Sequence, residues 1–117
     1  MEFALLIYGD EKAWDSAGED ERREMYAQHE KFSTMLQDAG AIRGGAELAS
    51  TTTARTIRHR GADLSVTDGP FAETAEQFGG FYLVEAADLD AAVEFAKQLP
   101  AATVEVRALV PTPESGS

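Results

Sequence analysis

One histidine in this sequence could take part in proton transfer. His29 lies four residues after Met25 and three residues before Phe32, a spacing that places all three side chains on one face of a helix. A partly buried imidazole can have its pKa tuned and can exchange protons near neutral pH. The same spacing also suits a core histidine bonded to a backbone carbonyl, so spacing alone leaves both roles open.

A second group of chemically active side chains follows a Thr-Asp-Gly-Pro sequence. Asp68 can accept hydrogen bonds from nearby backbone N–H groups, Gly69 tolerates unusual dihedral angles, and Pro70 fixes its own φ, so these residues predict a turn. Glu73 and Glu76 follow the turn, where packing requires no carboxylates. The two carboxylates could bind a cation or raise each other's pKa. Metal binding needs more oxygen ligands than this spacing provides, so we expect no metal site.

Three further side chains have both a functional and an ordinary interpretation. His59 is a second candidate proton carrier, although it precedes a predicted turn at Gly61, where an exposed histidine is usually inert. Tyr8 ends the first predicted strand, where its phenol could line a cleft or pack in the core. Arg58 could bind a carboxylate through its guanidinium fork, or could simply face solvent.

The hydrophobic pattern predicts the elements that must position these residues. Residues 2–8 predict a buried strand, and the capping-box spacing of Ser16 and Glu19 predicts a helix that runs to about Ala39, just before Gly40. Asp88 is expected to cap a second helix that ends near Pro100. Further strands are expected at residues 41–49, 54–59, 64–67, 80–86 and 104–110.

This order of elements predicts an α+β fold. It favours a ferredoxin-like antiparallel sheet with both helices on one face, in which the glycine pairs at 44–45 and 79–80 allow close backbone packing or bulges. The other face would have no cover within the chain, which is a liability in a monomer. We expect one domain over residues 1–110 and a disordered, polar tail over residues 111–117.

Several segments resemble the DGPF branch of the YCII-related proteins, which belong to the dimeric α/β-barrel superfamily. The likeness covers residues 5–11, 54–58, 68–82 and 104–107, in that order. It implies a homodimer in which the sheets of two subunits pack face to face and cover each other. Most members of the family have no assigned reaction, so the resemblance predicts the fold more closely than the activity.

The resemblance also implies a catalytic pair formed by His29 and Asp68. In the wider group, a helix histidine three residues before an aromatic residue is thought to pair with an aspartate close to a proline, which His29, Phe32, Asp68 and Pro70 match. A carboxylate bonded to one ring nitrogen would leave the other free to take or give a proton. The ligand site is then expected to be lined by Tyr8, Arg58, Pro70, Phe71, Glu73 and Glu76.

One departure from the family pattern bears on the ligand. Ala75 stands where these proteins usually have a lysine, so the chain lacks a contact that an anionic substrate could use. Two functions fit the sequence. One is a cofactor-independent lyase, isomerase or dehydrohalogenase that acts on a small molecule. The other is a non-catalytic ligand-binding or regulatory module, which the resemblance associates with extracytoplasmic-function sigma factors as protein partners.

Composition excludes several other classes. The net charge of −11 opposes direct nucleic-acid binding, which needs a basic patch. The chain has no cysteine for disulfides or thiolate chemistry, no apolar run long enough to span a membrane, and no apparent secretory signal. The sequence has neither of the two glycine-rich motifs that bind nucleotides, Gly-x-Gly-x-x-Gly after a strand and Gly-Lys-Ser/Thr. We therefore expect a cytoplasmic protein that needs no cofactor.

Overall fold

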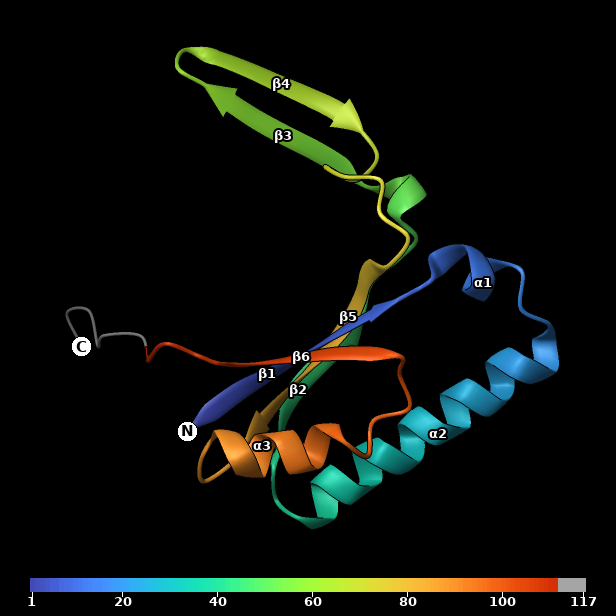
Figure 1. Cartoon of the computed structure of the whole chain (residues 1–117), viewed down its shortest axis with the longest axis vertical. Helices are drawn as coiled ribbons and strands as arrows, with labels where there is room; N and C mark the ends of the chain where they lie inside the picture. Colours follow the sequence, from blue (N-terminus) through green and yellow to red (C-terminus); the bar gives the residue numbers. More distant parts are fainter. Residues whose placement is uncertain (112–117) are drawn as a thin grey trace.

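The fold was obtained as a computed structural model that describes residues 1–111 (Figure 1). The tail predicted from residue 111 onward lies outside the described residues, except for Pro111. Along the described chain the elements are β1 (Glu2–Gly9), α1 (Glu11–Asp15), α2 (Glu19–Asp38), β2 (Ile42–Glu47), the short 3₁₀ helix η1 (Thr51–Thr53), β3 (Arg55–Arg60), β4 (Asp63–Asp68), β5 (Gln77–Glu85), α3 (Leu89–Ala96) and β6 (Thr103–Ala108).

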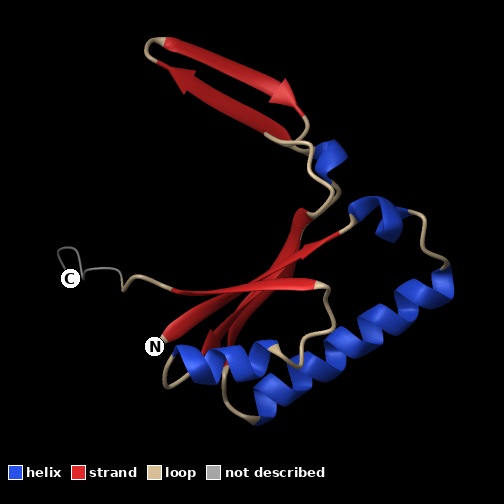
Figure 2. Ribbon diagram, viewed as in Figure 1, coloured by secondary structure: helices blue, strands red, loops and turns tan. Residues whose placement is uncertain are grey.

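The main sheet has the strand order β2-β5-β1-β6, with every neighbouring pair antiparallel. Its strands and the helices α2 and α3 follow one another as β1-α2-β2-β5-α3-β6, which is the βαββαβ order of a ferredoxin-like fold. Figure 2 shows α2 and α3 on one side of the sheet and no helix on the other. The predicted fold class is therefore confirmed.

The core lies between the sheet and the two long helices. Alternate residues of β1, Phe3 and Leu5, are buried on the helix side, and Val84 of β5 lies beside them. Phe32 and Leu36, one helical turn apart on α2, bury the facing stripe. This packing fixes which face of α2 points towards the sheet, and therefore where His29 is held.

Two glycines let the backbones of β2 and β5 approach closely. A Cβ atom on Gly45 would lie 2.7 Å from the carbonyl oxygen of Phe81, and one on Gly80 would lie 2.9 Å from the carbonyl oxygen of Ala46. Both distances are too short for a real side chain. The predicted close packing at the two glycine pairs is thus confirmed for one member of each pair.

The start of the long helix differs from the prediction. Ser16 does not cap α2, because it follows the last residue of α1, an element that the sequence analysis missed, and its hydroxyl donates to the carbonyl of Lys12 within that helix. Asp10 caps α1 through its carboxylate, while Gly18 precedes α2 with no side-chain cap. The predicted cap at Asp88 is confirmed, since its carboxylate accepts from the backbone N–H three residues later at 2.8 Å.

A hairpin formed by β3 and β4 projects from the end of the main sheet that lies near α1 (Figure 1). It leans over the side of the sheet that the helices leave open. The radius of gyration is 16.8 Å, against about 13 Å for a compact domain of this length. The chain is therefore a compact body with a separate two-stranded arm.

Candidate functional site

A cleft of about 1080 Å³ opens between one end of the main sheet and the helices α1 and α2. The ends of β1 and β2 and the start of β5 form one wall, and α1 and the first half of α2 form the other. Several aromatic residues contribute to this lining, among them Tyr8, Trp14, Tyr26, Phe78 and Tyr82. The cleft is therefore large enough for a small organic molecule and largely apolar in its walls.

Within the cleft, His29 of α2 meets Tyr82 of β5. The Nδ1 atom of His29 lies 3.0 Å from the hydroxyl of Tyr82, and the two ring planes are 11° from parallel. Phe32 packs edge-on against the Tyr82 ring, with the ring centroids 5.1 Å apart. The helix core thus fixes the tyrosine, and the tyrosine fixes the imidazole.

Burial keeps both members of this pair neutral. Desolvation lowers the pKa of His29, and the negative charge of Glu47 opposes that effect only in part. Desolvation likewise raises the pKa of the Tyr82 phenol. At neutral pH the imidazole is therefore uncharged and the phenol keeps its proton, so each can act as a hydrogen-bond donor or acceptor.

The bond between the two side chains determines what the free nitrogen of His29 can do. If Nδ1 donates its proton to the Tyr82 oxygen, Nε2 carries a lone pair and can act as a general base. If Nδ1 accepts the phenol proton, Nε2 carries the hydrogen and can act as a donor or acid. In both tautomers the bond to Tyr82 uses Nδ1 and leaves Nε2 for proton transfer to a bound molecule.

The outer wall of the cleft is built around Tyr26. Its hydroxyl lies 3.2 Å from a carboxylate oxygen of Glu47, and desolvation together with that carboxylate raises the pKa of the phenol. Trp14 packs edge-on against the Tyr26 ring at 5.5 Å, and the guanidinium of Arg22 lies over the indole. Arg22 also donates to the last carbonyls of α1, which holds α1 against α2.

The carboxylate of Glu11 links two elements at the rim of the cleft. Glu11 at the start of α1 accepts hydrogen bonds from the backbone N–H of Thr51, at 2.6 Å, and from its hydroxyl. These bonds lower the pKa of Glu11. The charged carboxylate therefore connects α1 to η1, from which the hairpin emerges.

The cleft is negatively charged. Its lining includes five carboxylates and, among residues 1–111, neither lysine nor arginine. The carboxylates are those of Asp10, Glu11, Asp15, Glu21 and Glu47. A ligand with a carboxylate of its own would therefore need a cation from elsewhere.

The predicted pair of His29 and Asp68 does not form within the protomer. Asp68 ends β4 on the hairpin, where its side chain is 86% exposed and pairs with Arg55 at 3.1 Å. His29 bonds Tyr82 in the cleft instead. The sequence placed His29 correctly on its helix, but it placed Asp68 in a turn, whereas Asp68 is the last residue of β4 and the hairpin carries it away from the helix of its own chain.

The other predicted lining residues divide between the cleft and the hairpin. Tyr8 lines the cleft. Arg58 donates to the backbone carbonyl of Phe71 at 3.0 Å, which holds the loop after Pro70 against the hairpin, while the Phe71 ring is 79% exposed. The cleft of the same chain is therefore lined by none of Arg58, Pro70, Phe71 and Asp68.

The two acidic residues after the turn are also outside the cleft. Glu73 and Glu76 are exposed on the segment that leads from the hairpin into β5, and His59 is exposed on the hairpin. Within residues 1–111, no group of three or more His, Asp and Glu side chains is placed to hold a metal ion. The glutamates therefore belong to the base of the arm.

Sequence reasoning missed Tyr82, Glu47, Tyr26 and Trp14. Tyr82 was recognised only as part of a strand. Alternation along β5 could have placed it on the helix side with Val84, because residues two apart on a strand share a face. Which residue of α2 it meets depends on how the helix crosses the sheet, and local pattern does not contain that information.

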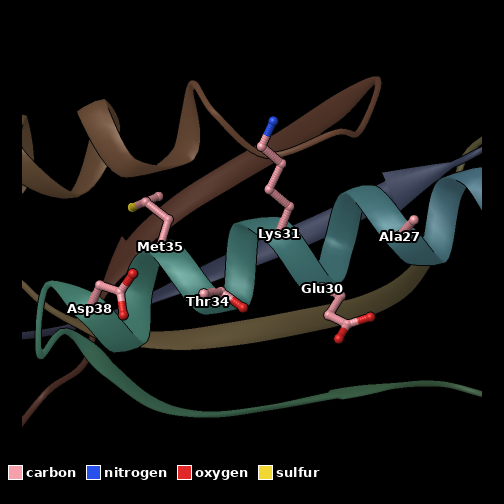
Figure 3. Close-up of a pocket in the computed structure, with 6 residues that line it drawn as sticks. All are labelled: Ala27, Glu30, Lys31, Thr34, Met35 and Asp38. Carbon is pink, nitrogen blue, oxygen red and sulfur yellow. The ribbon is translucent and has the colours of Figure 1, made fainter.

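A second hollow of about 540 Å³ lies along α2 and is lined by Ala27, Glu30, Lys31, Thr34, Met35 and Asp38. Figure 3 shows Lys31 and Glu30 pointing away from opposite sides of the helix. The residues share no hydrogen bond in the described structure, and none has a buried polar side chain. This groove lacks the features of a reactive site.

Comparison with known proteins agrees with the fold. A family model described as the YCII-related domain matches residues 1–112. The chain is also similar to an uncharacterised protein of Rhizobium meliloti (strain 1021), with 45% identity over 104 residues that cover 85% of this chain and 80% of that protein. None of the helices in residues 1–111 is long and apolar enough to cross a membrane. With its βαββαβ fold and a match over nearly its whole length, the chain belongs to the YCII-related family.

Proposed function

We propose that this protein is a cofactor-independent enzyme that moves a proton on a small organic molecule, as a lyase, isomerase or dehydrohalogenase does. The observation that supports it best is the bond between His29 and Tyr82 inside a cleft of about 1080 Å³. A neutral imidazole with one nitrogen fixed and the other available is suited to general acid–base catalysis near neutral pH. Aromatic walls would hold an apolar ring or chain beside it.

In this proposal His29 is the proton carrier and Tyr82 is the positioning residue. Tyr82 takes the orienting role that the sequence assigned to Asp68, because the phenol bonds Nδ1 within the protomer. Tyr8 is also among the residues that line the cleft. Asp68 could take part in the reaction only by reaching a cleft on another copy of the chain.

A homodimer is part of the proposed function. The strand register places Leu6 opposite Phe81 and Ala4 opposite Leu83, so their side chains share the sheet face that α2 and α3 leave open. Burial of such a face against an identical sheet would remove apolar area from water. The family resemblance supports the same arrangement, and the cytoplasmic location remains an expectation from the sequence.

One observation favours the alternative of a regulatory module. Three apolar side chains of the hairpin, Ile57, Leu64 and Val66, are each about 60% exposed, and such a surface can receive a protein partner. A partner related to an extracytoplasmic-function sigma factor rests on the family resemblance alone. This alternative predicts that partner binding survives the loss of His29.

The test combines an NMR titration with a search for turnover. We expect His29 to titrate below about 6.5, because burial lowers its pKa. Small cyclic acids and lactones would be screened as substrates, with His29→Gln, Tyr82→Phe and the control His59→Gln. If His29 is the general base, turnover should rise with pH through its pKa and should be lost in His29→Gln alone of the two histidine variants.

Two results would contradict the proposal. Turnover that persists in His29→Gln would show that another group moves the proton. A His29 resonance that titrates at the ordinary value, and does not respond to Tyr82→Phe, would show that the buried pair does not exist in solution.

A further inference from the structure

The hairpin has one apolar face that nothing else in residues 1–111 covers. In the β3–β4 register, Ile57 lies opposite Val66 and His59 opposite Leu64, so these four side chains share one face. Ile57, Leu64 and Val66 are 58%, 60% and 59% exposed. An isolated two-stranded hairpin is only marginally stable in water, so this face gains stability if another surface packs against it.

The direction and length of the hairpin identify where that surface lies. The hairpin leans over the open side of the main sheet, where a second copy would sit (Figure 1). Each strand has six residues and spans about 20 Å, whereas two packed sheets lie about 10 Å apart. The tip of the arm therefore extends past the sheet of a copy seated on the open face, to the level of that copy's helices and cleft.

Charge complementarity favours the same occupant. The strand β3 carries three of the ten lysines and arginines of the chain, at Arg55, Arg58 and Arg60. Arg55 and Arg58 have partners at the base of the hairpin, and Arg60 at the tip makes no ion pair in the described structure. The lining of the cleft, in contrast, has five carboxylates and, among residues 1–111, neither lysine nor arginine.

We propose that the hairpin is an exchanged arm that docks on a second copy of this chain and places Arg60 at the mouth of that copy's acidic cleft. Its apolar face packs on the second copy, while Arg60, which lies on the opposite face of the hairpin beside the turn at Gly61, extends past the end of the strand to the carboxylates at the cleft rim. The arm thereby supplies the cation that each cleft lacks and closes its open side. This inference rests on the homodimer proposed above, and it does not depend on the chemistry of His29.

A cross-linking experiment tests the position of the arm directly. The chain has no cysteine, so each introduced thiol is unique. Chains with Arg60→Cys and a size tag would be co-expressed with untagged chains that carry Glu21→Cys at the cleft, and a short bifunctional thiol reagent added. We expect a covalent dimer of one tagged and one untagged chain. The matched control is Glu30→Cys, which is also exposed on α2 but lines the other hollow, and it should link several-fold less.

A second variant distinguishes the proposal of an exchanged arm from the proposal of a homodimer. Ile57→Ser combined with Val66→Ser removes the apolar face of the hairpin, and the circular dichroism spectrum should stay unchanged because the hairpin lies outside the core. Sedimentation equilibrium should show a dimer dissociation constant raised at least tenfold. A dimer that ignores this change, with no link through Glu21→Cys, would overturn the arm and leave the homodimer standing. A chain that stays monomeric at every concentration would overturn both, while turnover at His29 would remain a separate question.

Discussion

Replacement of Tyr82 with phenylalanine removes one oxygen atom and tests whether the hydrogen bond between His29 and Tyr82 forms in solution. The hydroxyl bonds Nδ1 of His29 at 3.0 Å in a partly buried environment, and such a bond contributes about 0.5–1.5 kcal/mol net. The ring contact with Phe32 involves ring atoms and is retained. We therefore expect the free energy of unfolding to fall by about 1 kcal/mol, which corresponds to a Tm lower by about 4 °C for a domain of this size.

Equilibrium unfolding in urea, followed through the fluorescence of Trp14, would measure this change. A double-mutant cycle with His29→Leu isolates the interaction of the two side chains, and we expect a coupling of about 1 kcal/mol. Tyr26→Phe is the matched control, because the Tyr26 hydroxyl bonds the exposed Glu47 and the residue is 51% exposed. Its effect should stay within about 0.5 kcal/mol.

Additive effects of the two substitutions on the free energy of unfolding would refute this reasoning. If Tyr82→Phe and His29→Leu destabilise the protein independently, the two side chains do not share a hydrogen bond in solution. The same conclusion would follow if Tyr82→Phe were no more destabilising than Tyr26→Phe. The proposed proton carrier would then have no fixed tautomer, and the proposed role of Tyr82 would fall with it.

Two further predictions follow from the same geometry. Gly80→Ala should cost about 1–3 kcal/mol, because its Cβ would lie 2.9 Å from the carbonyl oxygen of Ala46, whereas Gly79→Ala, which meets nothing within 4 Å, should be nearly neutral in urea unfolding. Glu11→Gln should flatten the acid side of the Tm profile, because the pKa of Glu11 is lowered in the folded state by its bonds to Thr51. The stability that the natural carboxylate adds is present above its unfolded pKa and is lost as pH falls through the folded pKa; an unchanged acid profile would contradict the role of Glu11 at the rim.

Much of the fold could be predicted because it depends on local pattern. Alternating residues, a capping aspartate at Asp88 and glycines at turns are visible without tertiary information, and they gave the correct order of strands and long helices. The error at Ser16 shows the limit of such patterns. A hydroxyl and a carboxylate three residues apart suit a capping box, but the short helix α1 had already engaged that hydroxyl at its own end.

The site was harder to predict because its contacts join distant parts of the chain. His29 could be selected from helical spacing, which depends only on its neighbours on α2. Its bond to Tyr82 joins residues 53 positions apart, and it depends on the crossing of helix and sheet. The link to Asp68 came from the resemblance, which carries no information on whether two residues meet within one chain or between two.

The two halves of the predicted site now occupy different parts of the molecule, and this division has a physical consequence. The cleft holds His29 with aromatic walls and carboxylates, while Asp68, Arg58 and Phe71 lie on or beside the arm. Residues that share one site need not come from one protomer when a chain extends a hairpin beyond its own core. The proposed exchange of arms would bring basic and apolar side chains to a cleft that is acidic and open in the protomer. In that arrangement the stretch between the hairpin and β5 is the hinge of a shared site, so its glutamates, Glu73 and Glu76, would influence where the arm points more than what the cleft binds.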